Sequence, residues 1–260
     1  MERLHHEPPE AADSKILIVT GGSRGIGACT ARLAALRGYS VCVNYLRNYD
    51  AAMGVVDDIH KKSGNAIALQ ADISLEPDVV ALFETVEQTL GRPTALVNNA
   101  ARIELQMRLD SMDAARLHRM FATNAIGTML CSREAVRRMS PRAGGRGGSI
   151  VNVSSGAARY GSPGEYVDYA ATKGAVDTFT VGLAKEVAAE GIRVNGVRPG
   201  FIYTELHAAG GEPNRVDRLK AGVPMQRGGE PEEVAAAILW LLSTEASYVT
   251  GTFIDVSGGR

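Results

Sequence analysis

The sequence has few cysteines and aromatic residues, no excess of charge of one sign and no long apolar run. Its three cysteines, Cys29, Cys42 and Cys131, are odd in number and lack metal-ligand spacing, which argues against a disulfide framework or a zinc site. The 28 basic residues nearly balance the 29 acidic ones, so the electrostatic footprint of a nucleic-acid-binding protein is missing. No apolar run approaches the roughly 18 residues of a membrane span. We therefore expect reduced thiols, no bound metal, a cytoplasmic protein, and neither nucleic acid nor membrane as partner.

The 260 residues suffice for one large domain or two small ones with a full hydrophobic core. Residues 1–14 carry several acidic side chains and two prolines but no apolar core, so they do not resemble a secretory signal. We expect a disordered tail there, in which the adjacent His5 and His6 lack a third metal ligand. No composition shift or long linker divides residues 15–260, which favours a single domain.

Short β-branched and apolar runs alternate with segments of helical periodicity from Lys15 onward. Continuous apolar strands separated by helices are typical of a parallel sheet whose two faces are both covered. We therefore predict an α/β fold with a single Rossmann-type, doubly wound parallel sheet of seven strands and helices on both faces. The expected strands are 16–19, 41–44, 66–70, 95–98, 149–153, 193–197 and 252–256, and the expected helices are 26–37, 51–62, 76–90, 114–139, 167–189 and 230–243.

Glycine is the one residue type in excess, with 29 occurrences, and a cluster of glycines follows the first predicted strand at 20–27. Glycines at this point permit a tight turn, let the backbone approach a pyrophosphate and allow close packing of helix on sheet. The free N–H groups and the positive end of the following helix then face the phosphates. The loop predicts a dinucleotide-binding site made by Gly21, Ser23, Arg24, Gly25, Ile26 and Gly27.

The end of the second strand bears on which dinucleotide binds. An acidic side chain there would hold the ribose 2′-hydroxyl and repel a 2′-phosphate. Asn44 occupies this position, followed by Tyr45, so the acid is absent. Arg24 and Arg47 supply guanidinium groups that match phosphate oxygens. We expect NADP(H) to be preferred over NAD(H), although each arginine alone is also consistent with a solvated surface charge.

Tyr169 and Lys173 lie four residues apart at the start of a predicted helix and therefore share one face. At about 5 Å and an effective dielectric constant near 20, an ammonium group favours the phenolate by roughly 3 kcal/mol, or about two pKa units. Tyr169 is then expected to act as a general acid or base near physiological pH. Tyr160 and Tyr166 have no lysine at this spacing. An exposed helix pair without function is the alternative interpretation.

Two serines, Ser154 and Ser155, follow the predicted strand 149–153 at the carboxyl edge of the sheet. In open parallel sheets ligands bind at that edge. A hydroxyl there can hydrogen-bond a substrate oxygen whose charge changes during hydride transfer. Spacing alone does not choose between the two serines.

These motifs together resemble the short-chain dehydrogenase/reductase family, over Lys15 to Gly259. The glycine loop resembles the family's cofactor loop, and the run Asn98-Asn99-Ala100 resembles its motif after the fourth strand. Arg198 to Thr204 is similar to the segment that meets the nicotinamide amide. The further cofactor contacts that the resemblance implies are Asp72, Ile73, Asn98, Ala100, Tyr169, Lys173, Pro199, Gly200, Ile202 and Thr204.

The resemblance also implies catalytic roles for four residues. Tyr169 is the acid/base, and Lys173 lowers its pKa and holds the nicotinamide ribose. Ser155 orients the substrate carbonyl, and Asn124 holds a water molecule in a proton relay. Ser155 fits the family spacing better than Ser154, although it lies one residue farther from the tyrosine than usual. Ala101 replaces a glycine of the family pattern, which predicts slightly weaker cofactor binding.

The implied activity is hydride transfer between NADP(H) and a small-molecule carbonyl/alcohol pair by a Ser-Tyr-Lys mechanism. The resemblance inclines toward glucose 1-dehydrogenase, with 3-oxoacyl-[acyl-carrier-protein] reductase as the enzymatic alternative. A non-catalytic NADP-binding sensor or scaffold is the alternative of another class, which the intact Ser155, Tyr169 and Lys173 disfavour. Arginines at 137, 138, 142 and 146 resemble a docking patch for an acidic carrier, or simply favourable cations at a helix end.

Family resemblance implies two further features. The polar segment at about 204–222 is expected to form a substrate lid on the single dinucleotide-binding catalytic domain, 15–260, although a solvated helix explains its charges equally well. The helices that hold Asn124 and Tyr169 usually pack together in tetramers of this family, so a homotetramer is expected.

Overall fold

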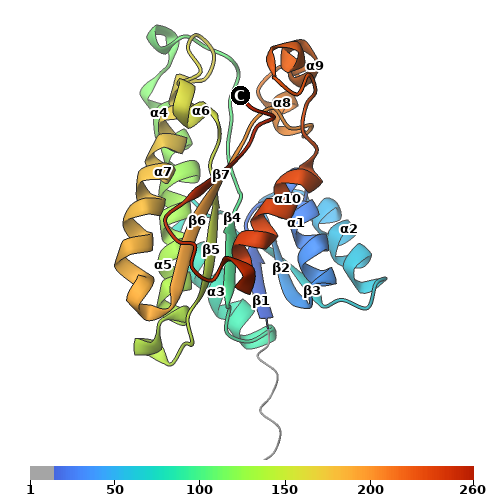
Figure 1. Ribbon diagram of the computed structural model, residues 1–260, viewed down its shortest axis with the longest axis vertical. Coiled ribbons are helices and arrows are strands. Elements are labelled where there is room, and N and C mark those ends of the chain that lie inside the picture. Colours follow the sequence, from blue (N-terminus) through green and yellow to red (C-terminus); the bar gives the residue numbers. More distant parts are fainter. Residues whose placement is uncertain (1–14) are drawn as a thin grey trace, which may run out of the picture.

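The computed structural model describes residues 15–260, and the expected disordered tail lies outside the described residues. Within them, a parallel seven-stranded sheet has the order β3-β2-β1-β4-β5-β6-β7 (Figure 1). The predicted α/β fold with a doubly wound sheet is thereby confirmed. The strands are β1 (Lys15–Val19), β2 (Tyr39–Tyr45), β3 (Ala66–Gln70), β4 (Ala95–Asn98), β5 (Gly148–Val153), β6 (Ile192–Pro199) and β7 (Phe253–Val256).

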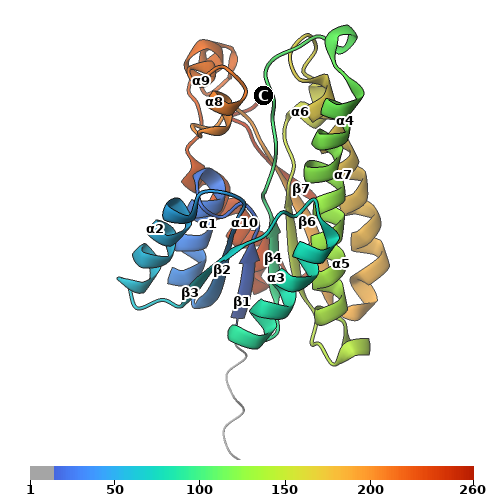
Figure 2. The same cartoon turned by 180° about the vertical axis from the view of Figure 1, so that it is seen from behind.

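Helices cover both faces of the sheet, as Figures 1 and 2 show from opposite sides. One face carries α1 (Gly25–Leu36), α2 (Tyr49–His60) and α10 (Pro231–Leu242). The other face carries α3 (Glu76–Thr89), α5 (Gly127–Met139) and α7 (Val167–Val187). Shorter helices lie near the carboxyl edge of the sheet: α4 (Ala114–Phe121), α6 (Ala157–Tyr160), α8 (Leu206–Ala209) and α9 (Arg215–Leu219).

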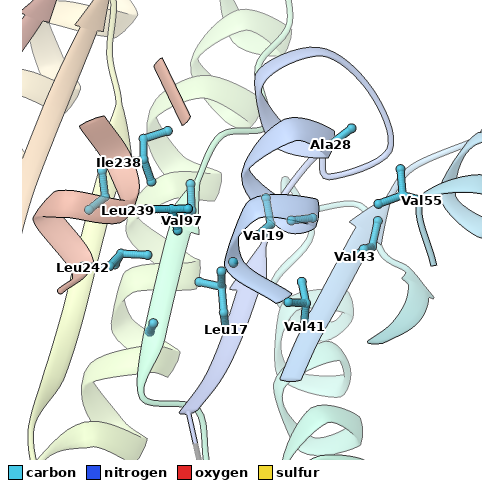
Figure 3. Packing of buried hydrophobic residues seen from close by; sticks show 14 of the residues in the cluster. Leu17, Val19, Ala28, Val41, Val43, Val55, Val97, Ile238, Leu239 and Leu242 are labelled. Atoms are coloured by element: carbon cyan, nitrogen blue, oxygen red, sulfur yellow. The ribbon is translucent and has the colours of Figure 1, made fainter. Parts of the chain in front are cut away.

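The core forms because successive side chains of a strand point to opposite faces of the sheet. Leu17 and Val19 of β1 pack under α1 and α10 in the cluster of Figure 3, where Ile238 and Leu239 are also labelled. Ile16 belongs to the cluster on the other face. Each fully buried side chain of this size contributes about 1.5–3 kcal/mol. The strands are therefore apolar on both sides, as the sequence pattern indicates.

The single helix predicted over 114–139 is wrong in one respect, because a π-helical turn, Ala122–Ile126, separates α4 from α5. Asn124 lies in this turn and is bound to the main chain of Arg102. Its Oδ1 accepts a hydrogen bond of 2.7 Å from the Arg102 N–H, and its Nδ2 donates one of 2.9 Å to the Arg102 carbonyl oxygen. Gly127, the first residue of α5, lies so close to Ile73 that a Cβ would be 2.8 Å from the Ile73 carbonyl oxygen. These contacts involve distant segments, so helical periodicity does not reveal the interruption.

The segment 204–222 lies above the carboxyl edge of the sheet, across from α4 and α6 (Figure 2). It folds as α8, α9 and a short 3₁₀ turn, Lys220–Gly222. The hydroxyl of Tyr166, before α7, donates a hydrogen bond of 3.0 Å to the Gly210 carbonyl. This contact fixes the segment over the residues that lead into α7. Among residues 15–260, no helix is long and apolar enough to cross a membrane.

Candidate active site

A cavity of about 510 Å³ opens at the carboxyl edge of the sheet, between the start of α7 and the segment 199–219. Its position matches the rule that ligands of open parallel sheets bind outside the carboxyl ends of the strands. Of the predicted site residues, it brings together Ile26, Ser155, Tyr169, Lys173, Pro199, Gly200, Ile202 and Thr204.

Tyr169 and Lys173 are both buried on the cavity side of α7, with exposed fractions of 9% and 3%. Lys173 Nζ lies 5.6 Å from the centre of the Tyr169 ring. The same Nζ donates a hydrogen bond of 2.7 Å to the main-chain oxygen of Val153, at the end of β5. The two side chains thus share one helix face, and Lys173 is anchored to the strand beside it.

Burial changes the protonation of this pair in a way that the sequence analysis did not predict. Burial raises the pKa of Tyr169 to about 12, although a hydrogen bond with Ser155 partly opposes this shift. Burial also lowers the pKa of Lys173 to about 8. The expected lowering of the Tyr169 pKa by Lys173 is therefore wrong for this structure. Loss of hydration outweighs attraction, because both groups lie away from water and each then favours its neutral form.

The two candidate serines differ in their contacts. Ser154 is buried, and its hydroxyl donates to the main-chain oxygen of Lys173 at 3.3 Å. Ser155 interacts with the Tyr169 hydroxyl, and its Oγ accepts a hydrogen bond from the Ala157 N–H at 3.1 Å. Both line the cavity, and Ser155 is the one whose hydroxyl adjoins the phenol.

Asn124 is fully buried and lies outside the cavity wall. Besides Arg102, its amide donates to Thr172 Oγ1 at 3.1 Å, and Thr172 donates in turn to the main-chain oxygen of Tyr169 at 2.7 Å. The π-helical turn is thereby linked to the first turns of α7. The geometry shows Asn124 as a support of that helix, and a water relay through it stays a prediction.

The glycine loop leaves no room for side chains. A Cβ on Gly21, which has φ +60°, would lie 2.9 Å from Ala100 Cα, and a Cβ on Gly27 would lie 2.5 Å from Asn99 Nδ2. The first turn of α1 has no acidic residue, and Arg24 at its N-cap makes no side-chain cap. The first N–H groups of a helix lack partners within it and attract anions. The loop therefore fits a pyrophosphate.

Asn44 at the end of β2 supports the glycine loop rather than facing a ligand. Its Oδ1 accepts a hydrogen bond of 3.2 Å from the Gly21 N–H, and its Nδ2 donates to the Ala71 carbonyl at 3.1 Å. Tyr45 is buried in the core. Arg24 and Arg47 are both exposed.

Several other predicted cofactor residues mainly stabilise turns and strand ends. Asn98 is buried and donates to Asn152 Oδ1 at 2.8 Å and to Ser132 Oγ at 2.9 Å. Asp72 accepts from the main chain and hydroxyl of Ser74, at 2.9 and 2.6 Å. The predicted residues outside the cavity wall are Gly21, Ser23, Arg24, Gly25, Gly27, Asn44, Tyr45, Arg47, Asp72, Ile73, Asn98, Ala100 and Asn124.

Sequence reasoning missed several residues of this region. Thr20 Oγ1 accepts hydrogen bonds from the N–H groups of Asn99 and Ala100, at 3.0 and 3.1 Å, and so joins the glycine loop to the end of β4. Its position directly after a buried strand is the sequence feature that could have identified Thr20. Four further wall residues come from other segments and carry no motif: Ile103, Tyr160, Tyr166 and Arg260. Other wall residues lie in the segment 198–204 or in the predicted lid, namely Phe201, Leu206, His207, Arg215 and Leu219. Within residues 15–260, no group of three metal-ligating side chains occurs.

Comparison with known sequences gives a consistent result. A family model described as enoyl-(acyl carrier protein) reductase matches residues 21–260. The uncharacterized oxidoreductase YgfF of Escherichia coli strain K12 is 60% identical, over 94% of this chain and 99% of YgfF. The bovine 3-oxoacyl-[acyl-carrier-protein] reductase is 41% identical, over 94% of this chain and 97% of its own. The rice glucose and ribitol dehydrogenase homolog is 36% identical, over 98% of this chain and 88% of the rice protein.

A solved structure agrees with the sequences. A short-chain dehydrogenase from Burkholderia cenocepacia J2315, crystallised in complex with NADP, superposes with a TM-score of 0.87 and is 30% identical, covering 94% of this chain and 97% of that chain. The chain belongs to the short-chain dehydrogenase/reductase family and is an oxidoreductase of that family.

Proposed function

We propose that this protein transfers a hydride between NADP(H) and a carbonyl/alcohol substrate, with Ser155, Tyr169 and Lys173 as the catalytic residues. The observation that carries the proposal is their convergence on one cavity that adjoins a glycine loop fitted to a pyrophosphate. The relative crystallised with NADP supports this choice of cofactor.

The bound nicotinamide would supply or accept the hydride. The loop 20–27 and the N-terminus of α1 would hold the pyrophosphate, since no side chain caps the N-terminus of this helix. Ile202 and Thr204, which line the cavity, would contact the nicotinamide side. Lys173 would hold the ribose through donors that its bond to Val153 leaves free.

Proton transfer is assigned to Tyr169. Because its pKa lies near 12, the phenol is protonated at neutral pH and can donate a proton to a carbonyl oxygen that gains charge during reduction. The Ser155 hydroxyl next to it can donate a hydrogen bond to the same oxygen. This arrangement favours the reductive direction near neutral pH. Alcohol oxidation requires the phenolate and is expected to accelerate as the pH rises.

The walls of the cavity favour a substrate with an apolar body. Ile103, Phe201, Leu206 and Leu219 line it, together with the rings of neighbouring tyrosines. A free aldose carries a hydroxyl on nearly every carbon, and each buried hydroxyl needs a hydrogen-bond partner. We therefore place ketones of the 3-oxoacyl kind ahead of glucose, the substrate that the sequence resemblance favours.

A carrier-docking role for the arginine cluster receives less support. Arg137 and Arg138 of α5 both form ion pairs with Glu134 at 2.8 Å, and Arg142 pairs with Glu190 at 3.3 Å. Each of these three arginines is thus already engaged with a carboxylate of the protein. We accordingly propose small thioesters and free ketones as substrates, with the acyl-carrier-bound form as an alternative.

The direct test is a reductase and dehydrogenase screen followed by nicotinamide absorbance. The panel contains acetoacetyl thioesters, free ketones, aldehydes and aldoses, each with NADPH or NADP⁺. We expect turnover of ketones and thioesters and little turnover of aldoses. Turnover of aldoses alone would restore the glucose dehydrogenase assignment, and cofactor binding without any turnover would favour the sensor or scaffold alternative.

The preference for NADP(H) has its own test. Titration with NADPH and NADH is expected to show tighter binding of NADPH, since Arg24 and Arg47 offer guanidinium groups and no acid follows β2. Arg24→Gln and Arg47→Gln should narrow the difference, whereas Arg142→Gln, at a distant surface position, should not. NADH binding that equals or exceeds NADPH binding would contradict the preference.

A further inference from the structure

Arg260 brings an unexpected cation to the cavity wall. It follows β7 in the sequence, and its guanidinium carbon lies 4.3 Å from the centre of the Phe201 ring and 4.9 Å from that of Tyr160. The main chain there is held in place, because Ser257 Oγ donates to the Arg260 carbonyl at 3.0 Å and Met225 N–H donates to the Gly258 carbonyl at 3.1 Å. The guanidinium group is thus fixed beside two aromatic faces.

The acidic side chains around the cavity are already paired with other cations. Glu165, the one acidic side chain of the cavity wall among the described residues, binds Arg215 and Arg218, which lower its pKa. Asp255 of β7 pairs with Arg159 at 2.6 Å and with Arg198 at 3.6 Å. Within residues 15–260, no acidic side chain forms an ion pair with Arg260.

The other cationic side chains of the cavity wall already have partners within the protein. Arg215 pairs with Glu165 and Glu212 and lies 5.0 Å from the centre of the Tyr166 ring. Lys173 donates a hydrogen bond to the Val153 carbonyl and lies beside the Tyr169 ring, and burial lowers its pKa to about 8. His207 lies against the Ile202 carbonyl, and burial lowers its pKa. Arg260 is therefore the arginine of the cavity wall that pairs with no acidic side chain among residues 15–260, whereas Arg215 pairs with two.

The chemistry of such an arginine suits an anion. Contact with aromatic faces restrains the plane of a guanidinium group and leaves the N–H donors along its edge for a ligand. A carboxylate matches that fork with two parallel hydrogen bonds. Arg260 is exposed at the cavity wall, so such a contact should weaken as salt is added.

We propose that Arg260 binds a carboxylate of the substrate, and that the protein acts on oxo acids whose apolar body separates the carboxylate from the reacting carbonyl. This inference rests on the proposed function, because it assigns a substrate class to the same cavity. Arg260, Tyr160 and Tyr169 line the same cavity; the Tyr160 ring contacts Arg260, and its phenol contributes to the raised pKa of Tyr169.

The experiment compares each oxo acid with its methyl ester, which has the same carbonyl and no charge. The series lengthens the methylene chain between the carbonyl and the carboxylate. We expect the ratio of kcat/KM for acid over ester to exceed one at a best chain length and to decrease with added salt. Arg260→Gln should lower that ratio about ten-fold, within the range of a hydrogen-bonded ion pair.

Two variants refine the result. Arg260→Lys keeps the charge without the planar fork and should retain only part of the ratio. Arg142→Gln removes a remote surface arginine and should leave the ratio as it is in the wild type. Unchanged selectivity in Arg260→Gln, or a wild type that treats acid and ester alike at every length, would overturn the proposal.

Binding measured by calorimetry distinguishes this proposal from the proposed function. If no carbonyl compound is reduced but an oxo acid binds the NADPH-loaded protein more tightly than its ester, with Arg260→Gln abolishing the difference, the anion site stands and the catalytic assignment fails. Reduction of esters and acids alike, with equal binding of both, leaves the catalytic assignment intact and rejects the anion site.

Discussion

Tyr169 and Lys173 lie in a site where loss of hydration dominates attraction between charges. Burial moves the pKa of the phenol up to about 12 and that of the ammonium group down to about 8. Each residue is therefore held toward its neutral form. A neutral phenol is a proton donor, which suits carbonyl reduction.

Replacement of Tyr169 tests its role directly. Tyr169→Phe removes the proton donor and should lower kcat for carbonyl reduction by about 100-fold or more, the usual contribution of a general acid. Tyr248→Phe is the matched control, since the Tyr248 ring is fully exposed. Steady-state rates with NADPH measure the effect. A wild-type rate in Tyr169→Phe would contradict the assignment of Tyr169 as the general acid.

Lys173 should limit stability at neutral pH. A pKa lowered from 10.5 to about 8 represents about 3 kcal/mol of disfavoured charge, and the bond to the Val153 carbonyl offsets about 1 kcal/mol. Lys173→Met should thus raise the free energy of unfolding by about 2 kcal/mol at pH 7 while impairing catalysis. Urea unfolding measures the change.

The stabilising effect of Lys173→Met should depend on pH. Between pH 8 and about 10.5 the unfolded chain holds more protons at Lys173 than the folded protein, so this residue's contribution to stability rises with pH in that window. The advantage of Lys173→Met should be complete below pH 8 and shrink above it. An advantage that stays constant up to pH 10, or a variant less stable at pH 7, would contradict the explanation.

At the scale of elements, a buried ion pair joins α4 to the start of α7. Arg116 Nε donates to Asp168 at 2.7 Å, and both side chains are almost completely buried. The Arg116 guanidinium also donates to the Leu105 carbonyl at 2.7 Å. Asp168 directly precedes Tyr169, so this pair connects α4 and the loop after β4 to the catalytic helix.

Removing one partner of this buried ion pair should lower the free energy of unfolding. Arg116→Leu leaves the Asp168 carboxylate buried without its cation, which predicts a loss of about 3–5 kcal/mol in the free energy of unfolding. Arg119→Leu is the control on the same helix, because Arg119 pairs with Glu104 at the surface and should matter far less. Urea unfolding of both variants separates the cases. Equal losses would show that the buried pair has no special role.

At the scale of the whole molecule, one surface presents apolar side chains to solvent. Phe121, Ile126 and Met129 are 37%, 49% and 38% exposed along α4, the π-helical turn and α5. Figure 2 shows these helices on the outside of the sheet. Such exposure is typical of an interface between subunits and supports the predicted homotetramer.

Light scattering coupled to size exclusion tests that assembly. We expect a tetramer for the wild type and smaller species for Ile126→Glu, since a charge at this exposed position would be buried without a partner in the interface. Leu36→Glu, at an exposed position on α1, is the control and should remain a tetramer. A wild-type monomer would reject the prediction.

The sequence alone determined the strands, most helices, the glycine loop and the Tyr169–Lys173 pair. These features depend on local periodicity and spacing, which the chain carries in consecutive residues. The positions of Ser155, Tyr169 and Lys173 on one cavity follow from the parallel sheet, whose carboxyl ends meet at one edge.

The tertiary structure decided what depends on contacts between distant segments. The Asn44 bond to Gly21, the π-helical turn at Asn124 and the place of Arg260 beside Phe201 join residues far apart in the chain. The direction of the Tyr169 pKa shift belongs here as well, because burial is a property of the packed site. Spacing predicts which groups are neighbours, and only packing determines how much water remains around them.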